Sequence, residues 1–241
     1  MEGLERVEFE PKIWGPHLWL VLGCIARFYP MSPTQTERCK HGEFISSLPY
    51  ILPCAGCRHN LHQSFQIDWD QHKDEYLHDR TSFSKFINSL HNQVNDKANK
   101  RQYTLHQHVE KFESFRRNCV CQAMDPSIWG PSCWLFLDII GRNYPTTPNT
   151  QVLTQHMILI SSLPHILPCN TSRSTAARVL AILEWEEHKQ SIVAQRSTFS
   201  RFINMFHNIV NFKLDKTDIH HDSTERLSVL VSGSFLGRWD D

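Results

Sequence analysis

A long internal repeat constrains the fold of this chain more than any other feature of its sequence. The segment 14–30, WGPHLWLVLGCIARFYP, returns as WGPSCWLFLDIIGRNYP at 129–145, 115 positions later. The segment 46–60, SSLPYILPCAGCRHN, returns as SSLPHILPCNTSRST at 161–175 with the same offset. Because the repeated blocks keep their order and spacing, they indicate a tandem duplication. A period of this length predicts two domains and not a solenoid of short repeats.

A third block supports the duplication and helps to set the domain limits. The sequence HNQVN at 91–95 returns as HNIVN at 207–211, 116 positions later, so one residue has been inserted between the second and third blocks. The expected organisation is a first domain at 11–103, a linker at 104–127, a second domain at 128–216 and a tail at 217–241.

Within each copy the apolar residues follow helical spacing. Trp14, Leu18, Leu22 and Ile25 recur every three or four positions, which is typical of an amphipathic helix with one buried face. No segment alternates convincingly as a half-buried strand does. We therefore predict an all-α fold of two tandem bundles, each of four or five helices, that pack on each other. Residues 1–10 are expected to form a loose leader. The expected helices are 14–29, 36–48, 54–65 and one from 81 onward in the first copy, and 129–143, 150–163, 169–183 and 197–213 in the second.

The composition argues against several classes of protein. Lys plus Arg and Asp plus Glu number 25 each, so no basic field favours nucleic acid as a partner. No apolar run approaches the roughly 20 residues that a membrane-spanning helix needs. The first residues lack the apolar core of a secretory signal peptide. We expect a cytoplasmic protein without a membrane or nucleic-acid partner.

One copy carries a pair of cysteines that the other lacks. Cys54 and Cys57 form a Cys-x-x-Cys motif, whereas Ser172 stands at the second position in the later copy. Pro53 predicts that Cys54 lies at a helix start, where free amides and the helix dipole favour a thiolate that can exchange disulfides. Three other interpretations stay open at this point: a zinc site that includes His59 and His62, a thioredoxin-like fold, and an inert structural disulfide.

Three motifs, in their order and approximate spacing, resemble the Erv/ALR family of FAD-dependent sulfhydryl oxidases. They are W-G-P-x-x-W followed by Y-P at 14–30, L-P-C-x-x-C at 52–57 and H-N-x-V-N-x-K at 91–97. The resemblance covers about residues 13–103 and extends through the duplicate without the cysteine pair. The economy of cysteines is similar to that of compact members encoded by large DNA viruses, which implies the host cytoplasm or a virion as the location.

The resemblance implies a helical bundle that binds FAD and oxidises thiols. Cys54 would take electrons from a dithiol of a protein substrate and Cys57 would pass them to FAD, from which dioxygen would accept them to give hydrogen peroxide. Aromatic side chains would bury the flavin and polar ones would hold the adenine, with no metal involved. The FAD-binding residues implied by the family are Trp14, Gly15, Trp19, Tyr29, Phe86, His91, Asn92, Val94, Asn95, Lys97, Lys100 and Tyr103.

The chain departs from the family pattern at three positions. Gly23 stands where many members have His, Phe86 where Trp is usual, and Ala98 where Leu is usual. These differences bear on the details of the FAD contacts. Taken alone, Trp14 and Trp19 are also compatible with ordinary core aromatics.

The second copy cannot form the dithiol, because Cys169 has no cysteine three positions later. By analogy with the dimers of this family, and with quiescin sulfhydryl oxidases, we expect a degenerate partner that completes an intramolecular pseudo-dimer without holding FAD; a further homodimer stays open. Cys119 and Cys121 form a candidate shuttle pair in the linker, although idle thiols are the simpler alternative. The main alternative function is a non-enzymatic helical interaction or scaffold module in which Cys54–Cys57 is a structural disulfide.

Overall fold

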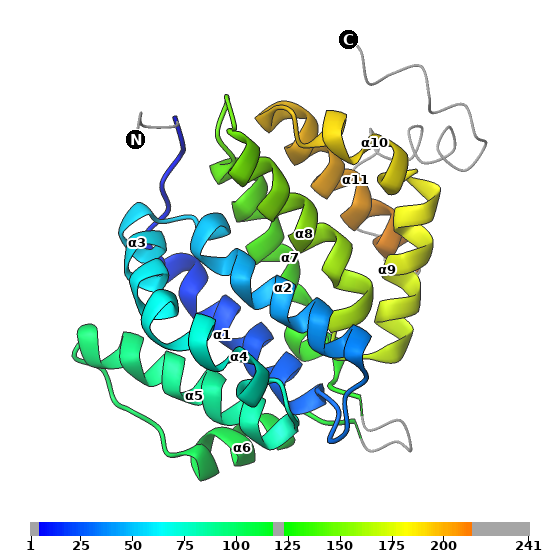
Figure 1. Ribbon diagram of the computed structural model, residues 1–241. Coiled ribbons are helices and arrows are strands. Elements are labelled where there is room, and N and C mark those ends of the chain that lie inside the picture. The colour runs from blue at the N-terminus through cyan, green and yellow to red at the C-terminus, as the bar shows by residue number, and fades with distance from the viewer. Residues whose placement is uncertain (1–4, 118–122, 214–241) are drawn as a thin grey trace.

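The structure is a computed structural model that describes residues 5–117 and 123–213. Within these ranges every regular element is a helix, which confirms the all-α prediction, and Figure 1 shows two bundles packed together. The first bundle contains α1 (Pro11–Phe28), α2 (Gln35–Ile51), α3 (Ala55–Ser64), the π-helix η1 (Phe65–Trp69), α4 (Asp70–Tyr76), α5 (Arg80–Lys97) and α6 (Leu105–Glu113). The second contains α7 (Pro126–Asn143), α8 (Thr150–Ile166), α9 (Asn170–Ile182), α10 (Trp185–Ile192) and α11 (Arg196–Lys213).

The first helix of each copy begins three residues before the repeated tryptophan. Pro11 opens α1 and Pro126 opens α7, at positions where the missing amide hydrogen would have no partner in the helix. Pro16, which the sequence placed in the first turn, consequently lies inside α1. The predicted apolar face is confirmed, since α1 buries Trp14, Leu18, Leu22 and Ile25.

Helix α2 runs through Pro49 to Ile51, although the sequence predicted that it would end before this proline. The amide of Leu52 still donates to the carbonyl of Leu48 at 3.2 Å. Only the hydrogen bond that Pro49 itself would donate is lost, so one further turn is tolerated. Helix α8 continues through Pro164 in the same way. These extra turns carry the chain directly to the cysteine that follows in each copy.

The segment between α3 and α5 is almost entirely helical, although the expected helices left 66–80 unassigned. It consists of η1 followed by α4. Trp69 at their junction is fully buried, and its indole N–H donates to the hydroxyl of Ser46 at 2.9 Å. Trp185 makes the same bond to Ser161 at 2.8 Å. The repeated tryptophan therefore holds the same part of the second helix in both copies.

The expected linker at 104–127 contains a helix that packs on the first bundle. Helix α6 contacts α1 and α5, and Glu113 at its end forms ion pairs with Arg27 of α1 and with Arg116. Gly23 makes room for this helix, because a Cβ there would lie 2.1 Å from the ring of Phe112. The glycine that departs from the family pattern thus has a structural reason in this chain.

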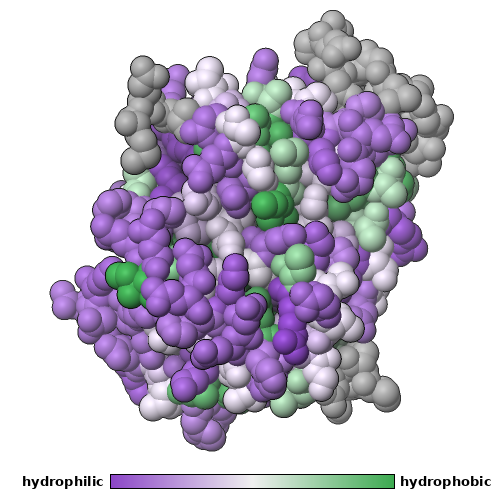
Figure 2. All heavy atoms as spheres, in the orientation of Figure 1, coloured by the Kyte–Doolittle hydropathy of each residue, from purple (hydrophilic) through white to green (hydrophobic). Residues whose placement is uncertain are grey.

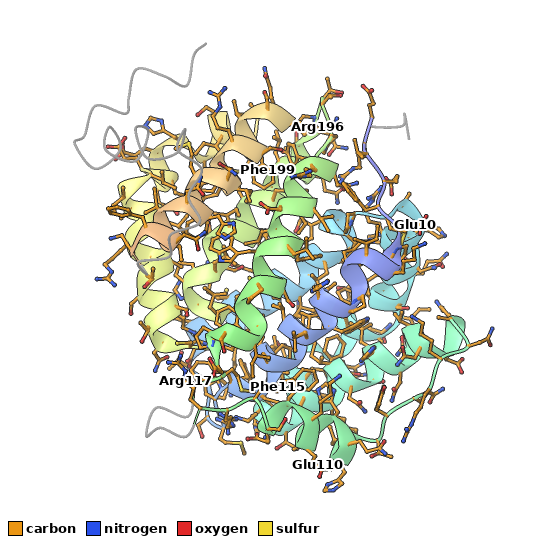
Figure 3. All side chains as sticks on the ribbon, turned by 180° about the vertical axis from the view of Figure 1, so that it is seen from behind. Glu10, Glu110, Phe115, Arg117, Arg196 and Phe199 are labelled. Carbon is orange, nitrogen blue, oxygen red and sulfur yellow. A yellow bond between two sulfur atoms is a disulfide. The ribbon has the colours of Figure 1, made fainter. Side chains whose placement is uncertain are left out.

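The two bundles pack through α1 against α7 and through α2 against α8. Figure 3, seen from behind, shows the first of these pairs. The ring nitrogen Nδ1 of His17 lies 2.9 Å from the hydroxyl of Ser132, and these two residues occupy equivalent positions in the repeat. Contact between equivalent residues is expected where a two-fold axis relates the halves of an interface. The duplication therefore brings equivalent residues of the two copies into contact.

The expectation of a loose leader is wrong for residues 5–10, which form hydrogen bonds with both bundles. The amide of Phe9 donates to the carbonyl of Pro53 at 2.8 Å, and the amide of Thr146 donates to the carbonyl of Glu5 at 3.3 Å. The segment therefore connects the far end of the second bundle to the loop that carries Cys54.

The visible surface in Figure 2 is mostly hydrophilic, with apolar residues in small separate groups. Within residues 5–117 and 123–213, no helix is both long and apolar enough to pass through a bilayer.

Candidate active site

The cysteine pair lies at the start of α3, as the sequence predicted for Cys54. Cys54 is the N-cap residue, and it forms a disulfide with Cys57 across a Cα–Cα distance of 5.2 Å. The amide of Cys57 donates to the sulfur of Cys54 at 3.2 Å. Amides that point at this sulfur stabilise negative charge on it, so the position suits a thiolate that leaves or attacks during disulfide exchange.

The structure removes two of the alternatives for this pair. A thioredoxin-like fold requires strands around the motif, and the described residues contain only an isolated bridge between Arg116 and Met124. A zinc site is not supported either, because the two cysteines are bonded to each other. The group of metal-ligating side chains found among the described residues is Glu184, Glu187 and His188, a partly exposed cluster in the other bundle.

A cavity of about 570 Å³ lies between α1, α3, α5 and α6, and Cys57 is part of its wall. Cys54 is outside the lining, so the two sulfurs differ in what they face. Leucines from α1, α2, α3 and α5 form much of the apolar wall, which is the character of a site for a flat organic ring. Of the residues that the sequence analysis assigned to FAD, the lining contains Trp14, Gly15, Trp19, His91, Val94, Asn95, Lys97, Lys100 and Tyr103.

An aromatic stack forms one side of this cavity. The ring of Trp19 lies parallel to that of His91, with 4.3 Å between centroids, and Tyr103 continues the stack at 6.2 Å from His91. Burial, together with Lys111 and Lys100, lowers the pKa of His91 to about 4. His91 is therefore a neutral ring at neutral pH, and it presents a flat aromatic surface beside the indole.

Positive charge is concentrated on the polar part of the lining. Among the described residues, the lining contains no aspartate or glutamate. An apolar and aromatic wall next to several cations fits a ligand that combines a flat ring with phosphate groups. The basic residues of the lining are Lys12, Lys97, Lys100, Arg101 and Lys111.

Three of the residues assigned to FAD lie outside the lining. Tyr29 is fully buried, donates its hydroxyl to the carbonyl of Leu77 at 2.8 Å and packs on Phe83. Phe86 is buried against Trp69. Asn92 holds the backbone of Tyr103 through two hydrogen bonds of 2.7 and 2.9 Å, and it thereby acts on the lining indirectly.

Sequence reasoning missed the contribution of α6, which places Lys111 and Phe112 in the lining. A signal for this helix was present. Thr104 and Gln107 form a capping box, in which each side chain bonds the backbone amide of the other. The helix was overlooked because it falls in a polar stretch after the last repeated motif, where no second copy supported an assignment.

The second copy keeps the aromatic stack but differs at the wall. Trp134 and His207 are parallel at 4.2 Å, as Trp19 and His91 are in the first copy. However, Phe206 replaces Leu90, and its buried ring lies edge-on to Trp134 at 5.4 Å. A larger side chain therefore occupies the position that borders the cavity in the first copy.

The remaining cysteines show no second redox pair among the described residues. Burial raises the pKa of Cys24 and of Cys133 to about 12, which makes both thiols unreactive, and Cys169 is a buried free thiol. The candidate shuttle pair Cys119 and Cys121 lies outside the described residues, and its role stays a prediction.

Comparison with known proteins gives one result for both halves of the chain. The model of the Erv1 / Alr family matches residues 16–113 and, a second time, residues 131–228.

Individual relatives agree with this match. A protein of Invertebrate iridescent virus 6 that is named as a FAD-linked sulfhydryl oxidase is 32% identical over 94 residues, which are 39% of this chain and 85% of that protein. One of Acanthamoeba polyphaga mimivirus with the same designation is 30% identical over 103 residues, 43% of this chain and 71% of the relative. The FAD-linked sulfhydryl oxidase of African swine fever virus (isolate Pig/Kenya/KEN-50/1950) is 27% identical over 88 residues, 36% and 70% of the two chains.

Proposed function

Since the chain belongs to the Erv1 / Alr family, we propose that it is a FAD-linked sulfhydryl oxidase that forms disulfides in protein substrates. The observation that carries this proposal is the position of Cys57 in the wall of a cavity with an apolar, aromatic side and a cationic side. The viral relatives bear the corresponding name, and their origin supports the cytoplasm of an infected cell or a virion as the place of action.

The lining residues fit FAD by their chemistry. Trp14, Trp19 and neutral His91 provide flat apolar surface for the ring system, and the cations on α5, α6 and the turn between them suit the two phosphates. When bound, FAD supplies a two-electron acceptor beside Cys57, from which dioxygen takes the electron pair to give hydrogen peroxide.

The chain's own residues carry out the exchange with the substrate. A substrate thiolate attacks the sulfur of Cys54, which lies outside the cavity, and the Cys54–Cys57 bond breaks with Cys57 leaving as a thiolate. The second substrate thiol loses its proton to solvent and attacks the mixed disulfide. A substrate disulfide forms and Cys54 leaves as a thiolate, which the amide of Cys57 is placed to stabilise. The substrate has lost two electrons, and the cysteine pair has gained them.

We propose that the second copy is a degenerate partner that binds no flavin and completes the bundle pair. Ser172 stands where the second cysteine of the dithiol would be. Phe206 is larger than Leu90, the residue that borders the cavity at the equivalent position of the first copy. The contacts of α1 with α7 and of α2 with α8 support this role, since they provide in one chain a dimer-like interface. One flavin per chain is the expected stoichiometry.

The test is made on the purified full-length chain. We expect flavin absorbance and oxygen uptake in the presence of dithiothreitol. Cys57→Ser should reduce uptake to the uncatalysed background while the flavin stays bound, because the sulfur that faces the cavity is gone. Cys169→Ser is the matched control in the second copy and should leave the rate unchanged. A colourless protein without oxygen uptake would instead support the scaffold alternative.

A further inference from the structure

Residues 5–9 form a strap that runs from the second bundle to the start of α3. In the second bundle, Arg196 donates to the carbonyl of Glu5 at 2.6 Å. Asn143 accepts from the guanidinium of Arg6 at 2.9 Å and donates to the carbonyl of Val7 at 2.7 Å. The labels of Arg196 and Glu10 in Figure 3 mark the two ends of this path. The degenerate copy thus holds a segment that reaches the cysteine pair of the active copy.

The strap places the carboxylate of Glu8 on the first turn of α3. One oxygen of Glu8 accepts from the amide of Ala55, the residue next to Cys54, at 2.5 Å. The other oxygen pairs with Arg58 at 2.8 Å, and Arg58 also donates to the carbonyl of Leu52 at 2.6 Å. The carboxylate of Glu8 therefore accepts a hydrogen bond from one of the free amides at the helix end, and this amide would otherwise stabilise a thiolate of Cys54.

The second copy repeats the last backbone contact of the strap without the charge. The amide of Met124 donates to the carbonyl of Pro168 at 3.0 Å, as Phe9 does to Pro53 at 2.8 Å. The residue at the position of Glu8 is Ala123, one before Met124. Arg173, the equivalent of Arg58, lies over the ring of Phe28, with 4.9 Å between the guanidinium carbon and the ring centroid. Hence the carboxylate occurs in the copy that has the dithiol and is absent from the copy that has lost it.

We propose that Glu8 is a positioning residue that opposes formation of the Cys54 thiolate and thereby favours the disulfide form of the Cys54–Cys57 pair. A nearby negative charge disfavours a second one, and removal of Glu8 would also free Arg58 to attract the thiolate, so both effects have the same sign. A pair with a less stable reduced form has a lower reduction potential and passes electrons onward more readily. This inference rests on the redox role proposed for the pair.

The other charged groups near the helix start do not replace Glu8. Arg6 on the strap and Arg58 on α3 are cations, and burial lowers the pKa of Arg6 only to about 10, so it stays protonated at neutral pH. His59 is exposed on the following turn of α3. His156 of the neighbouring α8 is kept neutral by burial, which lowers its pKa to about 3. Within residues 5–117 and 123–213, Glu8 is therefore the anion that contacts this end of α3.

The direct test measures the pKa of Cys54 in a chain that also carries Cys57→Ser, so that Cys54 is the free thiol of the motif. The rate of alkylation of Cys54 by iodoacetamide is followed against pH by mass spectrometry of its peptide. With Glu8→Gln, we expect the pKa of Cys54 to fall by about one unit. The change removes the negative charge that is bonded to Ala55, the residue next to Cys54, and keeps an oxygen acceptor there. Glu10→Gln, on the same segment but paired with Lys12, should cause no shift.

A second measurement uses the intact pair and separates charge from folding. In glutathione buffers at a pH above the pKa of Cys54, Glu8→Gln with both cysteines present should shift the disulfide–dithiol equilibrium about tenfold toward the dithiol, which corresponds to the same pKa change. Asn143→Ala, which loosens the strap from the other bundle, should shift it in the same direction by less. An unchanged or raised pKa of Cys54, or an unchanged equilibrium in Glu8→Gln, would overturn the inference with the oxidase activity intact. Absence of oxygen uptake in the unaltered chain would instead overturn the proposed function and leave the pKa result standing.

Discussion

The two copies share a buried cluster of a tyrosine and a histidine, and they differ in their sites. In the first, the hydroxyl of Tyr29 donates to the carbonyl of Leu77 at 2.8 Å, and the ring packs edge-on to His41. In the second, Tyr144 donates to Val193 at 2.6 Å and packs on His156 in the same manner. The cluster at this end of each bundle has therefore kept its contacts after the duplication.

The differences lie around the cysteines. Ser172 stands for Cys57, Phe206 for Leu90 and Val179 for Ser64, and the replacements in the wall are larger or more apolar. These three residues lie on α9 and α11, whereas the main contacts between the bundles are made by α1, α2, α7 and α8. The comparison teaches that this fold separates the residues that hold a bundle together from those that give it chemistry.

The largest expected effect is on the pH dependence of stability, and it tests whether the buried clusters of the two copies are equivalent. His41 and His156 are buried, and the Nε2 of each has no hydrogen-bond partner among the described residues. Burial lowers the pKa of His41 to about 4 and that of His156 to about 3. An unfolded histidine takes up a proton below pH ~6.5, whereas the folded one does not until these lower values, so stability falls as the pH falls from ~6.5 to about 4.

His41→Phe and His156→Phe should each remove about 1.4 kcal/mol per pH unit from the slope of unfolding free energy against pH in that window. Over two pH units the difference amounts to about 3 kcal/mol per histidine. Urea denaturation at several pH values measures it, and the slope above pH 7 serves as the internal control. If only one of the two variants changes the slope, the clusters are not equivalent.

The sequence predicted the long helices and showed the family motifs, but it did not predict α6 or α10, and it predicted only part of the site. Helical spacing located Trp19 on one helix and His91 on another, and the family motifs implied that they share a site, which the stack of their rings supports. The contribution of α6 was not predictable from spacing, because it depends on the room that Gly23 leaves for Phe112. The strap was missed because Glu8 lies in a polar stretch without periodicity. The residues that hold the strap also come from three distant parts of the chain, around Pro53, Asn143 and Arg196.

A smaller effect tests whether the wall of the cavity decides which copy binds flavin. Leu90→Phe gives the first copy the residue that the second has at this position. Because an added ring in a formed wall costs about 1–3 kcal/mol, we expect flavin occupancy to fall about tenfold, measured by absorbance after release from the protein. Phe206→Leu is the matched control and should leave one flavin per chain. Full occupancy in Leu90→Phe would show that the wall position does not distinguish the copies.

The smallest expected effect comes from restoring the lost cysteine in the second copy with Ser172→Cys. The backbone there already matches that of the active pair, since φ and ψ are −160° and 126° at Cys169 and −146° and 121° at Cys54. A disulfide should therefore form, and thiol counting would detect it. Oxygen uptake should stay the same, because the new sulfur would face the Phe206 wall and Cys169 is buried where Cys54 is accessible. A rate that rises toward twice the original, with a second flavin per chain, would mean that the cysteine was the only part of the site that the second copy had lost.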